Sequence, residues 1–290
     1  MSPNIVVVNA CQRGWQGGSP TAVVADDTSL SDAERCAIPV TAGTSHAVFI
    51  SAQDHRSSRP EVSLRFFTAA GELPACGHGT VAALAVLAER AGESEYEVTL
   101  QSGGRTYRGR ARGGRGRFRA DFDPGQVELR AIARGKSELV VSALGLDPDQ
   151  GSTQCQIASV GRPRMLVQVP DRRMVAELTP DLNRLREACD WLGLLGCYVY
   201  SAPRHHGRAA ARMFAPSIGV PEDIANANST ACLAVHVATR GLATVEVDMG
   251  DSLGAPATIM ASTRPGPGGP LVQVGGTATI PFLFQVGLPD

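Results

Sequence analysis

The sequence predicts an α+β protein of two pseudo-symmetric lobes, each a strand-rich sheet around one buried helix. Short runs rich in β-branched residues and bounded by glycines are typical of strands, as at residues 4–9 and 20–25. Two longer stretches, residues 80–90 and 229–239, are apolar on nearly every side, and a helix of that kind must be enclosed. The surroundings of the two helices also repeat, which indicates two lobes.

The repeated unit consists of a strand, a short loop and a buried helix. Segment 65–74 (RFFTAAGELP) corresponds to segment 212–221 (RMFAPSIGVP), and each precedes a loop of small residues. Two copies do not form a solenoid, which generally needs three or more. We therefore expect an N-terminal lobe of residues 1–123 with 278–290, a C-terminal lobe of residues 124–277, and an active site in the cleft between them.

The other elements are expected in chain order. A helix over about residues 32–38 follows Ser29 and Ser31, because serine is favoured at helix starts. A polar connection is expected near residues 123–131, and a further helix over about residues 181–192. Strands are expected at residues 46–50, 62–67, 105–122, 165–169 and 197–201, and near Val245, Ile259, Val272 and Ile280.

The composition argues against several classes of protein. The 290 residues carry a formal net charge of −1, and the arginines from Arg105 to Arg119 alternate with other residues as in a solvated hairpin, so no nucleic-acid partner is expected. No stretch approaches the roughly 20 apolar residues of a membrane helix, and residues 1–4 do not resemble a signal peptide. A cytoplasmic protein without membrane contact is expected. The seven cysteines form no C-x-x-C pair, which argues against a zinc knuckle or a disulfide framework.

The loop before the first buried helix carries the strongest chemical signal. Cys76 lies just ahead of the helix, where free backbone N–H groups and the helix dipole favour an anion. The pKa of a thiol in such a place can fall from about 8.5 to between roughly 3.5 and 7.5, which suits a proton-abstracting thiolate. Gly77 and Gly79 allow close approach of a ligand, and the N–H groups can hold a carboxylate. The alternative is a buried structural thiol.

The loop before the second buried helix offers different groups. Asn226, Asn228 and Ser229 supply amides and a hydroxyl at the helix start, and Asp223 lies just before them. Two helix N-termini converging on one cavity would stabilise an enolate or a carbanion beside a carboxylate. The alternatives are simple helix caps for Asn228 and Ser229 and a charge that interacts with the helix dipole for Asp223.

These motifs resemble one enzyme family. The matching segments are residues 65–80, residues 18–24 (GSPTAVV), residues 212–216 with Glu222 and Asp223, and, more weakly, residues 159–161, 254–256 and 274–276. They resemble the phenazine-biosynthesis PhzF-like family, which shares the diaminopimelate epimerase fold with the proline racemases. The resemblance implies curved, mostly antiparallel sheets around the central helices, a site between the lobes, no cofactor or metal, and frequent homodimers.

The resemblance also assigns roles to residues. It implies catalytic roles for Cys76, His46, His78 and Asp223, and substrate-binding roles for Gly77, Gly79, Thr80, Asn226, Asn228, Ser229 and Ser19. His46 stands where the family's isomerases carry a glutamate, so an imidazole would replace that acid/base. The alternative for His46 is a satisfied core histidine.

The motif Cys76-Gly77-His78-Gly79 resembles the first cysteine motif of the proline racemases, whereas Asn228 takes the place of their second cysteine. A two-base racemase needs an acid on each face of the carbon, so a single-site proton shift or an elimination is favoured. We expect a cofactor-independent isomerase that moves a double bond in a small carboxylated intermediate of secondary metabolism, an amino or imino acid that is proline-derived or dienoic. The alternatives are an epimerase or dehydratase with Cys76 as base, and a non-catalytic relative that binds small acids.

Overall fold

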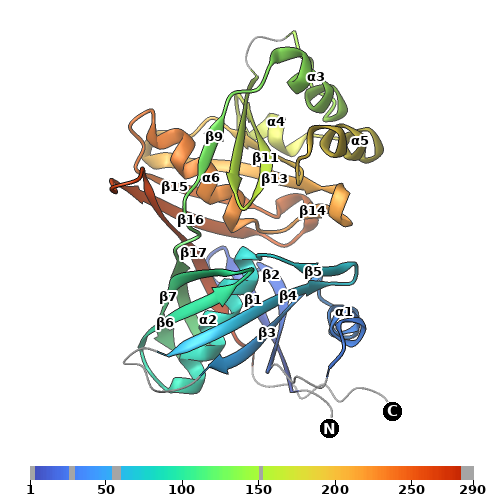
Figure 1. Cartoon of the computed structure of the whole chain (residues 1–290). Helices are drawn as coiled ribbons and strands as arrows, with labels where there is room; N and C mark the ends of the chain where they lie inside the picture. Colours follow the sequence, from blue (N-terminus) through green and yellow to red (C-terminus); the bar gives the residue numbers. More distant parts are fainter. Residues whose placement is uncertain (1–3, 26–29, 54–59, 150–152, 282–290) are drawn as a thin grey trace. The chain divides into compact units, whose positions relative to one another are not determined.

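The computed structural model describes residues 4–25, 30–53, 60–149 and 153–281 (Figure 1). Contacts between Cα atoms group the chain into two compact units, Met1–Asp123 with Gly275–Asp290, and Pro124–Val274. Residues 282–290 of the expected N-terminal lobe and Ser29 of the expected helix start lie outside the described residues. Each unit is an α+β structure with a mostly antiparallel sheet, as the sequence predicts.

The first unit is a sheet of eight strands around the helix α2 (Gly77–Ala91). Its strands are β1 (Ile5–Gln12), β2 (Ser19–Ala25), β3 (His46–Gln53), β4 (Glu61–Thr68), β5 (Gly71–Leu73), β6 (Glu95–Ser102), β7 (Arg105–Gly114) and β8 (Arg117–Phe122). The end of β17 (Leu271–Thr279) also belongs to this sheet, because it pairs with β1. Only β2–β3 and β4–β6 pair in parallel among the strand pairs of this unit that are described. The helix contacts β1, β2, β3, β6, β7 and β8. The surface of α2 is rich in alanine, so the strands can lie close to the helix. Gly109 of β7 illustrates this closeness, because a Cβ atom added there would lie only 2.7 Å from Leu84 Cδ2 of α2.

The two faces of this sheet carry different side chains, because side chains alternate in direction along each strand. Ala47, Phe49 and Phe67 belong to a cluster under the helix α1 (Asp32–Thr41). Because successive side chains of a strand point to opposite faces, His46 faces α2 instead. The helix α1 begins at a capping box formed by Ser31 and Glu34, and it runs past the predicted end at residue 38 to Thr41.

The second unit surrounds the helix α6 (Ala227–Ala238). Its strands are β9 (Glu128–Arg130), β10 (Gln154–Val160), β11 (Arg162–Val169), β12 (Cys197–Ser201), β13 (Arg208–Ala215), β14 (Val220–Asp223), β15 (Thr244–Met249) and β16 (Ala257–Arg264). Pairs β11–β12 and β13–β15 are parallel, and the other described pairs of this unit are antiparallel. The helix contacts β9, β10, β11, β15 and β16.

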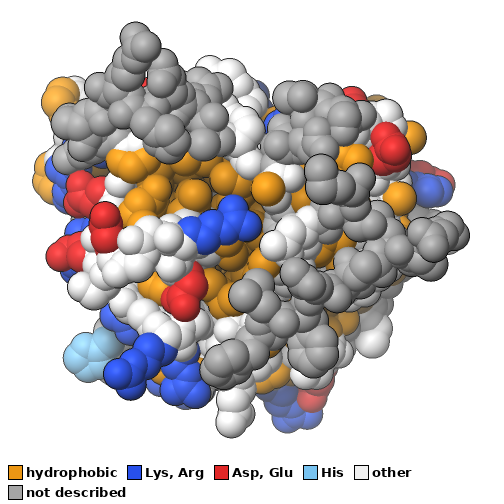
Figure 2. All heavy atoms as spheres, turned by 90° about the horizontal axis from the view of Figure 1, so that it is seen from below, with side chains coloured by type: hydrophobic (Ala, Val, Ile, Leu, Met, Phe, Trp, Pro, Cys, Tyr) orange, Lys and Arg blue, Asp and Glu red, His pale blue; other side chains and the backbone are white. Residues whose placement is uncertain are grey.

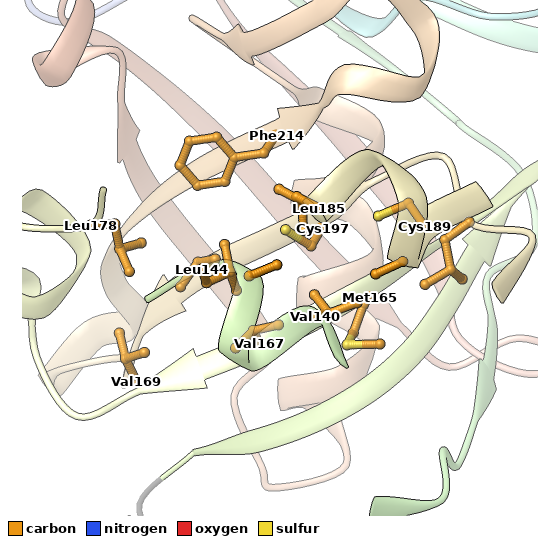
Figure 3. Close-up of a cluster of buried hydrophobic side chains, with 14 of the residues drawn as sticks. Val140, Leu144, Met165, Val167, Val169, Leu178, Leu185, Cys189, Cys197 and Phe214 are labelled. Carbon is orange, nitrogen blue, oxygen red and sulfur yellow. The ribbon is translucent and has the colours of Figure 1, made fainter. Parts of the chain in front are cut away.

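The opposite face of this sheet is covered by α3 (Arg134–Ala143), α4 (Arg172–Ala176) and α5 (Leu182–Leu192). Figure 3 shows the apolar cluster that joins them to the sheet, with Met165, Val167 and Val169 from β11. The alternate residue Arg164 therefore faces α6. The prediction lacked α3, α4 and β10, and it also lacked the strands β5, β6, β9 and β14. Gly135 and the adjacent Val140 and Val141 are weak helix formers, so packing against α5 rather than local preference stabilises α3.

The surface carries both signs of charge. On the face shown in Figure 2, basic and acidic side chains lie interspersed among apolar ones. On the β7–β8 hairpin, Arg110 pairs with Asp121, and Arg112 pairs with Glu95 of β6. All seven cysteines are free thiols. Among the described residues, no helix is both long and apolar enough to cross a membrane.

Candidate active site

Three of the residues singled out from the sequence lie together in the first unit. Cys76 Sγ is 3.3 Å from His78 Nε2, and the rings of His46 and His78 meet edge to face with their centroids 4.5 Å apart. The exposed fractions are 4% for His46, 6% for Cys76 and 2% for His78. The structure thus places one thiol and two imidazoles in contact, away from bulk water.

Local backbone structure explains how Cys76 presents its sulfur. Cys76 is the N-cap residue of α2, with extended φ and ψ of −143° and 115°, and its side chain makes no capping hydrogen bond. Instead, the Thr80 hydroxyl donates to the Cys76 carbonyl oxygen at 2.9 Å. The sulfur therefore stays available to His78 while the backbone is fixed by Thr80.

Gly79 makes room for this arrangement. A Cβ atom at residue 79 would lie 3.1 Å from Cys76 Sγ and 3.0 Å from the ring of Phe66. Both distances are shorter than ordinary van der Waals contacts. Gly79 is thus needed for packing between α2 and β4, and Gly77 is the first residue of α2.

The buried setting determines the charge state of His46. Burial is the larger cause that holds the pKa of His46 well below its usual range, and the nearby charge of His78 lowers it further. The Ser45 hydroxyl lies 2.8 Å from His46 Nδ1 and fixes the orientation of the ring. His46 is therefore a neutral imidazole at neutral pH, able to accept a hydrogen bond on one nitrogen.

Tyr107 and Ser19 are two further polar residues of this unit, and no sequence pattern marked Tyr107 as functional. Burial raises the pKa of Tyr107 to about 12, and its phenol forms a hydrogen bond with Thr80, next to Cys76. Ser19 lies at the start of β2, two residues before Thr21, which pairs with His46. The Ser19 hydroxyl is buried without a hydrogen-bond partner among the described residues.

The second loop belongs to the second unit and is organised by Asn226. Asn226 Oδ1 accepts a hydrogen bond from Ser229 N at 2.9 Å, so Asn226 is the N-cap of α6. The capping alternative considered for Asn228 and Ser229 is wrong, because α6 begins at Ala227 and both residues already lie in its first turn. Asp223, which is buried, accepts a hydrogen bond from Asn226 Nδ2 at 2.9 Å. Asn228 is half-buried and has no side-chain hydrogen bond within the described ranges.

Arg164 is a residue that the sequence analysis missed. It is 2% exposed, its Nη1 donates to Ser229 Oγ at 3.1 Å, and its Nη2 donates to the Arg162 carbonyl oxygen. Its Nε has no hydrogen-bond partner in the described part of the chain. Burial lowers the pKa of Arg164, and the thiol of Cys232 is the one nearby group that counteracts this shift. The expected strand began at Met165, so no pattern marked Arg164 as buried.

Comparisons with known proteins agree with this fold. Residues 10–282 match the PhzC-PhzF family, described as phenazine biosynthesis-like protein. The chain is 26% identical over 245 residues to the uncharacterized isomerase YddE of Salmonella typhimurium, covering 83% of this chain and 81% of the relative. It is 25% identical over 276 residues to the trans-2,3-dihydro-3-hydroxyanthranilate isomerase of Pseudomonas fluorescens, covering 90% of each.

Solved structures share the same fold. A predicted epimerase from Pseudomonas aeruginosa matches with a TM-score of 0.82 and 23% identity, over 99% of this chain and all of the other. A probable proline racemase from Agrobacterium radiobacter matches with a TM-score of 0.66 and 11% identity, over 99% of this chain and 93% of the other. The protein is an isomerase with the fold of the proline racemases and epimerases. It belongs to the PhzC-PhzF family.

Proposed function

We propose that this isomerase moves a proton between two carbon atoms of a small carboxylated molecule and thereby shifts a double bond. The observation that carries the proposal is the contact of 3.3 Å between Cys76 Sγ and His78 Nε2, beside the imidazole of His46. A thiol and an imidazole at this distance can exchange a proton, which is what a general acid–base pair requires.

The reaction balances without an oxidant or a cofactor. The Cys76 thiolate, formed when the thiol gives its proton to His78, takes a proton from a carbon atom of the substrate, and the neutral imidazole of His46 lies beside this pair. The electron pair of the broken C–H bond enters the conjugated system, and the double bond moves. The conjugate acid then returns a proton to a second carbon atom, so substrate and product have the same composition.

The substrate carboxylate is proposed to bind at the start of α2. Backbone N–H groups of Gly77 and Gly79 belong to the first turn of α2, where N–H groups lack partners within the helix. The same N–H groups stabilise negative charge that develops on the substrate during proton removal. The unpartnered hydroxyl of Ser19 is a further hydrogen-bond donor for the substrate.

The loop at the start of α6 is proposed to serve the same reaction. Asp223 is a buried carboxylate and Asn228 is half-buried without a described partner, so both suit a polar ligand. The first turn of α6, with Ser229, supplies N–H groups as α2 does. We assign Asp223 an acid–base or positioning role, and Asn226, Asn228 and Ser229 a binding role.

The named relative supports a proposal for the substrate class. Its name describes a ring that is partly reduced and carries amino, hydroxyl and carboxylate groups. An unsaturated amino acid of this kind, made and consumed in secondary metabolism, fits a site with a helix N-terminus for the carboxylate and a base for the C–H bond. A cyclic imino acid related to proline is the second substrate class to test, since a proline racemase shares the fold.

Proton exchange in deuterated water tests the proposal. The protein is incubated with trans-2,3-dihydro-3-hydroxyanthranilate and, separately, with L-proline and trans-4-hydroxy-L-proline, and the products are analysed by NMR and mass spectrometry. In the unsaturated substrate, a double-bond shift with deuterium bound to a new carbon atom supports the proposal, whereas deuterium uptake by either saturated proline ring indicates epimerisation. Absence of deuterium uptake in every substrate overturns it.

The alternatives give different products. An epimerase inverts one centre and incorporates deuterium there without moving a double bond, whereas a dehydratase releases water. Because the resemblance places Asn228 where the racemases carry their second cysteine, we expect no inversion. Product analysis of the same reaction mixtures separates the three outcomes.

A further inference from the structure

The group His46, Cys76 and His78 also has the composition of a metal site. One thiol and two imidazoles are ligands that zinc and related divalent ions prefer. A candidate ligand atom from each residue lies within 4.8 Å of the others, and all three residues are buried. Among the described residues, this is the one group of histidine, cysteine and acidic side chains close enough to hold an ion.

The distances fit a tetrahedral ion after small movements. With Zn–S of about 2.3 Å and Zn–N of about 2.0–2.1 Å, the ligand atoms of a tetrahedral site lie about 3.3–3.6 Å apart. Cys76 Sγ and His78 Nε2 are already 3.3 Å apart. The remaining separations, at most 4.8 Å, close by adjustments of about 1 Å or slightly more in side-chain torsions.

The surroundings favour the required orientation of His46. Its Nδ1 lies 2.8 Å from the Ser45 hydroxyl, which leaves Nε2 as the ligand nitrogen. Histidine ligands in proteins usually have a hydrogen bond of this kind on the other ring nitrogen. His46 is also the residue at which this chain departs from the glutamate expected by resemblance, so an imidazole stands there in place of a carboxylate.

We propose that His46, Cys76 and His78 bind one Zn²⁺ ion, with a water molecule at the fourth position. Binding replaces the thiol proton: Cys–SH and Zn²⁺ give a Cys–S–Zn bond and a released proton, and no electron is transferred. The ion and one thiolate leave a net charge of +1 beside the positive end of α2, which weakens the site. We therefore expect zinc that exchanges with a chelator.

Zinc at this site prevents the proposed proton transfer, because the metal occupies the lone pairs that would accept the proton. This consequence rests on the proposed function, whereas the binding does not. Zinc binding is measured without substrate, so failure of the metal site and failure of the isomerase proposal give separate results.

The experiment uses untagged protein stripped with a chelator and titrated with Zn²⁺ by isothermal calorimetry and equilibrium dialysis. We expect one ion per chain, bound at least tenfold more weakly by Cys76→Ser and by His46→Gln. The matched controls are Cys232→Ser and His236→Gln, which alter a buried cysteine and a buried histidine of α6 outside the group. Both controls should bind zinc as the parent does.

Two further measurements use the unaltered chain, so they hold even where a variant fails to fold. Co²⁺ should give a sulfur-to-cobalt charge-transfer band, and Zn²⁺ should slow alkylation of Cys76 at least tenfold while leaving the partly exposed Cys36 unaffected. No bound zinc, binding that survives in a folded Cys76→Ser or His46→Gln variant, binding lost in either control, or unchanged alkylation of Cys76 would each overturn the proposal.

Discussion

The ring of His46 meets the ring of His78 at an interplanar angle of 86°, so an edge of one imidazole points at the face of the other. His78 in turn contacts Cys76, and the three side chains form a continuous set of contacts from β3 to the start of α2. In a buried site of low dielectric, a change in the protonation of one member affects the others strongly.

Gly79→Ala should destabilise the fold and reduce activity. The added Cβ would lie 3.0 Å from the Phe66 ring and 3.1 Å from Cys76 Sγ, so these two buried side chains must shift by a few tenths of an ångström. We expect a loss of about 1–3 kcal/mol in the free energy of unfolding, as for other overpacked cores, measured by urea denaturation. The control is Gly135→Ala in α3, where a Cβ meets no atom within 4 Å. The control should raise stability by up to about 1 kcal/mol, and equal effects of the two changes would contradict the packing account.

Ser229→Ala should lower the free energy of unfolding substantially only while Arg164 is present. The Ser229 hydroxyl accepts a hydrogen bond from Arg164 Nη1, and its removal leaves a second nitrogen of a buried guanidinium without a partner. The expected cost in unfolding free energy is about 1–3 kcal/mol. In an Arg164→Met background the same change should cost less than about 0.5 kcal/mol. A double-mutant cycle from denaturation curves measures the difference, and equal costs in both backgrounds would show that the hydrogen bond is unimportant.

His46 should make the fold sensitive to acid. Because burial lowers its pKa in the folded chain, the unfolded chain takes up a proton on this imidazole below about pH 6.5, whereas the folded chain does not. Protonation therefore favours the unfolded state, and stability falls as the pH drops from about 6.5 towards the folded pKa.

The measurement compares parent and His46→Gln protein, both in chelator, by denaturation at pH 7 and pH 5. The variant should lose less stability over this interval than the parent. His236, whose pKa is also lowered, mainly by burial, contributes equally to both proteins and cancels in the comparison. An identical loss in the two proteins would mean that His46 does not titrate as the structure implies.

Much of the fold could be predicted from the sequence, because two of its helices are unusually apolar. The starts of α2 and α6 were expected at residues 80 and 229 but lie at Gly77 and Ala227. Glycine is a poor helix former, so the first turn of α2 resembles a loop in sequence. The duplication itself was visible because both copies keep the same order of strand, loop and helix.

Part of the site could also be predicted from the sequence. Cys76 and His78 share one short motif, so their proximity follows from sequence. The contact of His46 with His78 depends on how β3 packs against α2, which local patterns do not determine. Arg164 gave no signal, because an arginine beside an apolar run is normally exposed, and its burial follows from the strand beginning two residues before it.

The central claim, that Cys76 and His78 exchange the proton that the reaction moves, is tested most directly by one comparison. Deuterium incorporation into trans-2,3-dihydro-3-hydroxyanthranilate from deuterated water is measured for the parent, Cys76→Ser and Cys232→Ser proteins. We predict that Cys76→Ser lowers the rate by about 100-fold or more, since a positioned acid–base group contributes 10²–10⁴-fold, while Cys232→Ser retains the parental rate. Parental deuterium incorporation by a folded Cys76→Ser protein would contradict the account.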